Sequence, residues 1–222
     1  MSPESSVRPV ARPGARILMI GDSQVVGDYG KVMSKKLRLA GAEVFQYGVA
    51  SSTPEWWIKG TAGTSGWSVR LNDVSQGPPG NTWKNPHRTP TLASLLETHQ
   101  PQTLIISMGG NLRGKSEVTI RKQVDDLLFI ARGRVAEIIW VSSPERRSDD
   151  RNRADYEKFT ALLRIAVGAS ARFIDSSKHS DYPQSERQGD GTHLIGAHAE
   201  SWALAVMADL QTIEPNEAGR TA

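Results

Sequence analysis

Short apolar runs alternate with amphipathic segments along most of this chain. The run from Ile17 to Ile20 indicates a buried strand over Arg16–Ile20, because four apolar residues are too few for a convincing helix. Similar runs predict further strands, and apolar residues three or four positions apart predict helices between them. The other predicted strands are Glu43–Tyr47, Thr103–Ser107, Glu137–Val141 and Arg172–Ile174; the predicted helices are Asp28–Ala40, Thr91–Thr98, Glu117–Ala131, Arg153–Val167 and Gly196–Leu210.

Strands that alternate with helices predict an α/β fold, a three-layer α/β/α sandwich around a parallel sheet. Five strands fit a flavodoxin-like five-stranded order, 2-1-3-4-5, numbered along the chain. In such sheets ligands bind beyond the carboxyl ends of the strands where the order reverses, here between the first and third strands. The turns that end those two strands are Gly21-Asp22-Ser23 and Gly109-Gly110-Asn111, so we expect Ser23 and Asn111 to face each other.

The alternating pattern is lost from 51 to 90, where Gly, Pro, Ser, Thr and Asn dominate. Stretches this long without periodicity are usually functional loops or disorder. Four tryptophans lie in this stretch, which favours an ordered substrate loop because disordered segments are poor in aromatic residues. We expect a disordered arm over 1–15, a single domain over 16–212 and a frayed tail over 213–222.

The composition is that of an ordinary globular domain: 222 residues, 38% of them hydrophobic and 23% charged. A net charge of +3 without a long Lys/Arg run is too weak to indicate a nucleic-acid partner. The absence of cysteine excludes disulfides and thiolate metal sites. No apolar run approaches the length of a membrane span, and the first residues do not read as a signal peptide. The compartment therefore stays open: cytoplasmic as written, or cell envelope or extracellular if a leader has been removed.

Ser23 lies where a buried strand is predicted to turn into a helix. Its hydroxyl would point off the sheet edge, and the helix N-terminus behind it offers free backbone N–H groups and a positive partial charge. Those conditions stabilise an alkoxide or an oxyanion. The alternative is that Asp22 or Ser23 serves only as the helix N-cap.

Asp190-Gly191-Thr192-His193 precedes the last predicted helix. In a turn, the carboxylate of Asp190 could accept a hydrogen bond from Nδ1–H of His193, which would leave Nε2 free to take a proton from Ser23. Alone, the motif carries little weight, because Asp-Gly is a routine turn. The histidines show no zinc spacing: His193 and His198 are five positions apart with no third ligand nearby.

Taken in order, Gly21-Asp22-Ser23, Gly109-x-Asn111 and Asp190-x-x-His193 resemble the motifs of the SGNH (GDSL-like) hydrolases, over most of the chain. The resemblance implies a three-layer fold and a serine ester hydrolase with no metal or other cofactor. It implies that Ser23 is the nucleophile, that His193 is the general base and then acid, and that Asp190 orients His193.

The resemblance also implies an oxyanion hole made by the Ser23 N–H, a backbone N–H of the Gly48–Ser51 turn and the Asn111 side chain. This chain departs from the family pattern in that turn. If Thr53 anchors the motif, Ser51 stands where the family has glycine; its N–H remains, but glycine's tolerance of positive φ is lost. Gly48 is the fallback donor. Leu112 also replaces an aspartate that often follows the family's asparagine.

Trp56 and Trp57 follow the expected oxyanion turn and should lie near the rim of the site. Exposed indoles suit flat sugar faces, and O-acetylated polysaccharide is a common substrate class among similar small enzymes; the alternative is that both rings pack the loop down. Arg113 could face a polyanion or belong to a solvated surface. We expect these three residues and Asp22 to bind substrate.

The substrate is therefore expected to be a small ester or an acetylated polysaccharide, and the expected function is that of a carbohydrate O-acetylesterase. Two alternatives remain at this point: a catalytically inactive polysaccharide-binding module of the same fold, and an O-acyltransferase.

Overall fold

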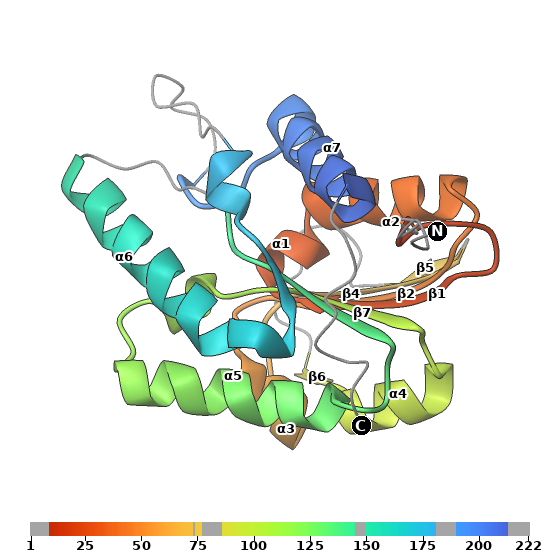
Figure 1. Ribbon diagram of the computed structural model, residues 1–222, viewed down its shortest axis with the longest axis horizontal. Helices are drawn as coiled ribbons and strands as arrows, with labels where there is room; N and C mark the ends of the chain where they lie inside the picture. Colours follow the sequence, from red (N-terminus) through yellow and green to blue (C-terminus); the bar gives the residue numbers. More distant parts are fainter. Residues whose placement is uncertain (1–8, 73, 77–85, 145–149, 181–189, 213–222) are drawn as a thin grey trace, which may run out of the picture.

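A seven-stranded sheet of order β5-β4-β2-β1-β7-β8-β9 forms the middle layer of the molecule (Figure 1). The computed structural model describes residues 9–72, 74–76, 86–144, 150–180 and 190–212. Along the chain the elements are β1 (Arg16–Gly21), α1 (Ser23–Val26), α2 (Asp28–Leu39), β2 (Glu43–Val49), α3 (Pro54–Lys59), β3 (Ala62–Gly63), β4 (Trp67–Leu71), β5 (Val74–Gln76), β6 (His87–Arg88), α4 (Leu92–His99), β7 (Thr103–Ser107), η1 (Gly110–Leu112), α5 (Glu117–Ala131), β8 (Glu137–Val141), α6 (Asp150–Val167), η2 (Gly168–Ser170), β9 (Arg172–Ile174), η3 (Ser176–Lys178) and α7 (Gly196–Thr212).

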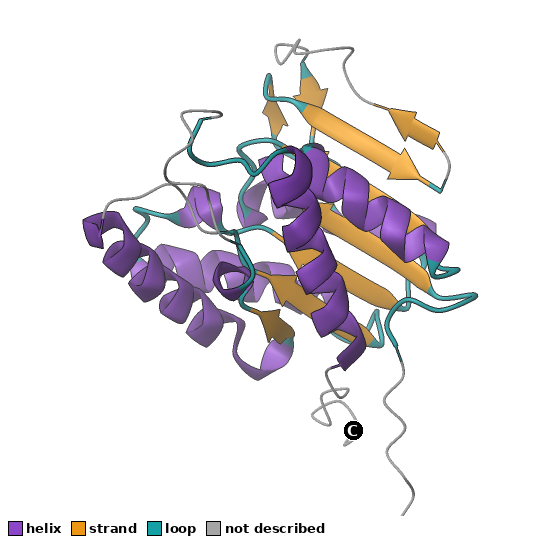
Figure 2. Ribbon diagram, turned by 90° about the horizontal axis from the view of Figure 1, so that it is seen from above, coloured by secondary structure: helices purple, strands orange, loops and turns teal. Residues whose placement is uncertain are grey.

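Helices cover both faces of the sheet, as predicted for an α/β/α sandwich. Figure 1 shows α1, α2 and α7 on one face and α3, α4 and α5 on the other, and Figure 2, seen from above, shows helices lying over the strands of the sheet. Successive residues of β1 alternate between the two cores: Ile17 and Met19 pack on the α2/α7 side, and Leu18 and Ile20 on the other. A parallel strand buried on both faces has this continuous apolar sequence.

The five parallel strands follow the order β2-β1-β7-β8-β9, which matches the predicted 2-1-3-4-5 order of those strands. The order reverses between β1 and β7, so the turns carrying Ser23 and Asn111 meet at one edge of the sheet. The predicted count of five strands was too low. Strands β4 and β5 extend the sheet beyond β2 and run antiparallel.

These extra strands come from 51–90, which was predicted to be an ordered loop without regular structure. That prediction was wrong, because the stretch holds α3, β4, β5 and a small sheet of β3 and β6. In β4, Trp67, Val69 and Leu71 alternate with the buried Ser68 and Arg70, so a charged residue inside the protein interrupts the expected apolar pattern. Trp83 lies outside the described residues.

Residues 9–15 do not form part of a disordered arm. Val10, Ala11 and Ala15 are at most 6% exposed and pack in the α2/α7 core, and Gly14 N–H donates to the Gly41 carbonyl at 3.2 Å. Residues 1–8 and the expected tail over 213–222 lie outside the described part of the chain. In that part, no helix has the length and apolar character needed to cross a membrane.

Candidate active site

Ser23 is the first residue of α1, directly after the turn that ends β1. Gly21 is required at this turn, because a Cβ there would lie 2.3 Å from the Ser107 carbonyl oxygen and 2.2 Å from Cγ2 of Val25. Asp22 is the N-cap of α1: its carboxylate accepts a hydrogen bond from the backbone N–H of Gln24 at 3.0 Å. Asp22 therefore takes the capping role, which leaves the Ser23 hydroxyl available for other contacts.

Asp22 was predicted to bind substrate, and its placement contradicts that prediction. The residue is only 2% exposed, and its carboxylate holds the start of α1 from inside the protein. Burial beside the turn that carries Ser23 gives Asp22 a structural role.

The Asp190–His193 loop brings a carboxylate and an imidazole to Ser23. Oδ2 of Asp190 lies 2.6 Å from Nδ1 of His193, and Nε2 of the same ring lies 2.7 Å from Oγ of Ser23. The other carboxylate oxygen accepts from the backbone N–H groups of Thr192 and His193, each at 2.9 Å. The three side chains thus form one continuous hydrogen-bonded relay.

The charge state of Asp190 sets the direction of this relay. Partial burial raises the pKa of Asp190, but hydrogen bonds from the His193 and Thr192 backbone and the His193 ring outweigh it, so the pKa lies below its usual value. An ionised carboxylate accepts at Oδ2, and the proton of a neutral imidazole then sits on Nδ1. Nε2 is left as the acceptor for the Ser23 hydroxyl.

Ser51 adopts the backbone conformation that glycine would favour. Its φ is 65°, in the left-handed region, so the serine occupies that conformation despite its side chain. Among the described residues, the N–H groups of Ser51 and Ser23 have no hydrogen-bond acceptor. Both remain able to donate to a bound group.

Gly48, the fallback donor, lies inside β2 rather than in the turn. A Cβ on Gly48 would come within 2.7 Å of the Val26 backbone nitrogen. This glycine therefore lets α1 pack against β2. Because its backbone is paired with Gly21 of β1 on one side and Ser68 of β4 on the other, the geometry does not support Gly48 as the oxyanion donor.

Asn111 is tied to the Ser51 turn by its neighbour Ser52. Nδ2 of Asn111 donates to the Ser52 carbonyl at 3.0 Å, which uses one of its two N–H bonds. The hydroxyl of Ser52 donates to the Gly21 carbonyl at 3.4 Å and accepts from Nε1 of Trp57 at 3.1 Å. One buried serine therefore links all three segments that carry the expected oxyanion donors.

Comparisons with known proteins bear on the fold that carries this site. No protein-family model matches the chain. It is similar to the protein BcsX of Komagataeibacter xylinus, with 26% identity over 205 residues that cover 88% of this chain and 74% of that protein. It is also similar to the structure of Axe2, an acetylxylan esterase from Geobacillus stearothermophilus, with a TM-score of 0.57 and 13% identity over 93% of this chain and 99% of that one. A GDSL-like lipase from Bacteroides thetaiotaomicron has a TM-score of 0.54 and 10% identity, over 88% of this chain and 87% of that one. The chain has the fold of the SGNH hydrolases.

Within this SGNH fold, two residues outside the motifs hold the histidine loop. Gln24 is 7% exposed, and its Nε2 donates to the Thr192 carbonyl at 3.0 Å. Asp28 accepts from the Gly196 N–H at 3.1 Å; its hydrogen bonds from Lys31 and from Gly196 lower the pKa of this carboxyl. Sequence analysis missed both residues, because neither is marked by spacing or periodicity.

The remaining predicted contact residues differ in their surroundings. Trp57 is fully buried, so the alternative that it packs the loop down is correct. Trp56 is half-buried. Its ring packs on Gly63 so closely that a Cβ added to that glycine would lie 3.1 Å from the ring. The Arg113 guanidinium lies 5.5 Å from the centre of the Tyr156 ring, and Tyr156 in turn donates to the Ser143 carbonyl. Nothing in this geometry directs Arg113 to a ligand.

No group of three or more His, Asp or Glu side chains in the described ranges is arranged to hold a metal ion.

Proposed function

We propose that this protein is a serine ester hydrolase that works through an acyl-enzyme on Ser23. The observation that carries the proposal is the relay at 2.7 Å and 2.6 Å, which runs from the Ser23 hydroxyl through His193 to Asp190. A serine hydroxyl is a weak nucleophile until an adjacent base takes its proton. The relay also favours an enzyme over an inactive binding module, which would not need it.

In the proposed reaction, His193 Nε2 removes the Ser23 proton while Oγ attacks the ester carbonyl. The N–H groups of Ser23 and Ser51 and the free Nδ2–H of Asn111 stabilise the negative oxygen of the tetrahedral intermediate. His193 then protonates the leaving alcohol. Water, activated by the same imidazole, attacks the acyl-enzyme and releases the acid and Ser23.

Asn111→Ala is expected to lower kcat by about 10²–10³-fold, roughly 3–4 kcal/mol, with little change in KM. The amide contributes most when the carbonyl oxygen becomes negative, so its loss affects the transition state more than substrate binding. Steady-state hydrolysis of p-nitrophenyl acetate measures both constants. Thermal unfolding serves as the control, because Asn111 also holds the Ser52 carbonyl. A full kcat in a folded variant would remove Asn111 from the oxyanion hole.

We further propose that the natural substrate is an O-acetylated carbohydrate. The support is an aromatic corner, formed by Trp56, Trp67 and His87, beside the oxyanion turn. Trp67 pairs with Val49, and the adjacent Gly66 carbonyl accepts the N–H of Ala50 at 2.7 Å. The residue that pairs with Trp67, Val49, is therefore only two positions from Ser51 along the chain.

The side chains of the aromatic corner support one another. The His87 ring stacks on Trp67, with centroids 4.9 Å apart and planes at 15°, and Gly63, which underlies Trp56, pairs with His87. Burial lowers the pKa of His87, so the corner is uncharged at neutral pH. Partly exposed flat rings of this kind bind the apolar faces of sugars. The similarity to an acetylxylan esterase is in keeping with this substrate class.

Acetate release from acetylated xylo-oligosaccharides, compared with a panel of short-chain p-nitrophenyl esters, tests the substrate. We expect preference for the acetylated sugar, and we expect Trp67→Ala to raise KM for that sugar about tenfold, equivalent to about 1.4 kcal/mol, without changing KM for p-nitrophenyl acetate. Equal effects on both substrates would contradict a sugar-binding role. Acetyl transfer to an added sugar, with no acetate released, would indicate an acyltransferase instead.

A further inference from the structure

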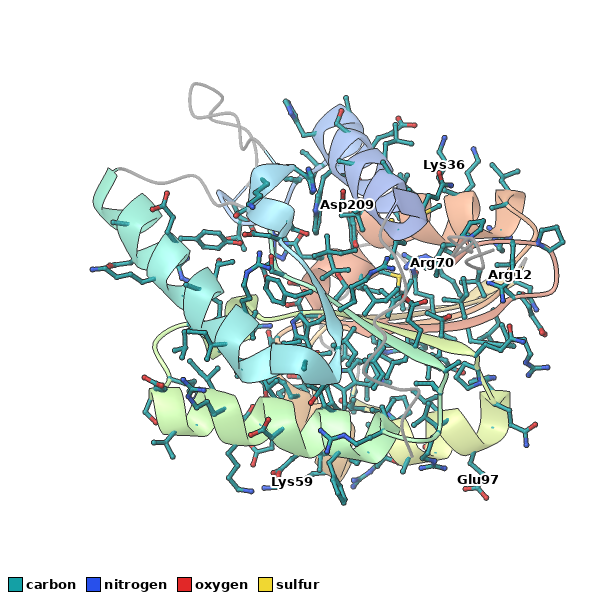
Figure 3. All side chains as sticks on the ribbon, in the orientation of Figure 1. Arg12, Lys36, Lys59, Arg70, Glu97 and Asp209 are labelled. Carbon is teal, nitrogen blue, oxygen red and sulfur yellow. The ribbon has the colours of Figure 1, made fainter. Side chains whose placement is uncertain are left out.

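Arg70 is a buried cation beneath the helix that carries Ser23. It lies on β4 and is 7% exposed. Nη1 contacts the Val25 carbonyl at 2.8 Å, and Nη2 contacts the Val26 carbonyl at 2.8 Å. Figure 3 labels Arg70 between the sheet and the helices above it, on the opposite side of the sheet from Lys59 of α3 and Glu97 of α4.

These contacts occupy the C-terminal end of α1. A helix of a single turn leaves its last carbonyl groups without intrahelical partners, and this end carries a negative partial charge. The guanidinium satisfies two of these carbonyls at once with donors in a fixed plane. Ser23 and its N–H lie at the other end of the same turn.

Gln46 fixes the guanidinium and connects it to α2. Gln46 is fully buried; its Oε1 lies 2.6 Å from Nη1 of Arg70, and its Nε2 donates to the Gly30 carbonyl at 2.8 Å. Ser68 adds a third contact to Nη1 at 3.1 Å. The position of α1 is thus defined by directed hydrogen bonds from β2 and β4, in addition to apolar packing.

Burial makes this arrangement costly. It lowers the pKa of Arg70 to about 10, so the side chain is still charged at neutral pH, with Asp28 as the charge that opposes the shift. Replacing Arg70 alone would leave the Val25 and Val26 carbonyls and Oε1 of Gln46 without this donor, so the arginine also contributes to stability. Stability and the location of α1 therefore depend on the same directed donors, and a kinetic measurement is needed to separate the two roles.

We propose that Arg70 is a positioning residue for the reaction: by holding α1 at its C-terminal end, it keeps the Ser23 hydroxyl aligned with His193 and the Ser23 N–H aligned with the oxyanion. The inference rests on the proposed ester-hydrolase function. It adds a residue of β4 to the groups on which that function depends. A displacement of about 1 Å in a reacting group can cost about 10²-fold in rate.

Arg172 provides a matched control. It is similarly buried, at 9% exposed, and its Nη1 pairs with Glu137 at 2.9 Å at the amino end of β8, the end of the strand away from Ser23. Arg70→Met, Arg70→Lys and Arg172→Met are compared at a temperature at which all are folded. The measurements are kcat and KM for p-nitrophenyl acetate, the rate of fluorophosphonate labelling, and hydrogen exchange of the α1 amides.

Arg70→Met is expected to lower kcat and the labelling rate about 10²-fold with KM within threefold, and to speed exchange in α1. Arg70→Lys, which keeps the charge without the planar fork, should lose about tenfold. Arg172→Met should keep kcat within twofold, even if its melting temperature falls as far as that of Arg70→Met. If Arg70→Met does not fold, the kcat, labelling rate and α1 exchange of Arg70→Lys test the proposal instead.

The proposal is overturned if the Arg70 variants retain kcat, or if Arg172→Met loses as much kcat as they do. A wild-type protein that neither hydrolyses esters nor reacts with the probe would instead overturn the ester-hydrolase function. In that case the exchange of the α1 amides still tests whether Arg70 holds this helix, because that measurement does not depend on turnover.

Discussion

Ser23→Ala is expected to lower kcat for p-nitrophenyl acetate by about 10⁶-fold and to abolish labelling by a fluorophosphonate. Oγ is the atom that becomes acylated, and it lies 2.7 Å from the imidazole that activates it. Alanine is a good helix former, and the cap of α1 is provided by Asp22, so the fold should be unaffected. Circular dichroism and thermal unfolding check that point.

Ser34→Ala is the matched control for this variant. Ser34 also lies in a helix, is 1% exposed, and its hydroxyl has no partner among the described residues. Removing that hydroxyl should leave hydrolysis and labelling unchanged. Turnover by Ser23→Ala at a rate near that of the wild type would end the assignment of Ser23 as the nucleophile.

The parallel part of the sheet could be predicted because its strands are buried on both faces. In β1 every residue from Ile17 to Ile20 is inaccessible to solvent, which requires an uninterrupted apolar run that is readily recognised. Strand β4 was not recognised because one of its faces lies under α1 and carries Ser68 and Arg70. A buried strand can be recognised from the sequence only when the side chains that it buries are apolar.

The same reasoning explains which parts of the site could be predicted. Ser23, His193 and Asp190 belong to short motifs whose residue types are dictated by the chemistry, and the structure brings their side chains together. Gln24 and Arg70 act on backbone carbonyls that are 168 and 45 positions away, respectively. Every residue offers a carbonyl, so no residue type marks the partner in the sequence.

Ser51 is an intermediate case. Serine stands where the family has glycine and lacks glycine's tolerance of positive φ, yet the residue takes φ 65°. The surrounding contacts of Ser52 with Gly21, Trp57 and Asn111 hold the turn closed. Strain of a non-glycine residue in this region persists only where neighbouring structure determines it, and the sequence of the turn alone does not contain that information.

His193→Gln is expected to reduce kcat by about 10⁶-fold, as much as Ser23→Ala, because the serine and its base act as one unit. Glutamine can keep a hydrogen bond to Asp190, but it cannot accept the serine proton at neutral pH. The double variant Ser23→Ala/His193→Gln should therefore be no slower than either single variant. Hydrolysis of p-nitrophenyl acetate by the three proteins measures this non-additivity.

His179→Gln is the control that separates catalysis from packing. His179 also contacts a carboxylate, with Nε2 2.6 Å from Oδ2 of Asp209 on α7. Its side chain is 27% exposed, compared with 37% for His193. Loss of a similar ring and of its contact with a carboxylate should therefore affect stability at least as much as His193→Gln does, while kcat stays within about threefold. Equal losses of kcat in the two variants would mean that the protein needs these histidines for its fold, and that His193 is not the base that activates Ser23.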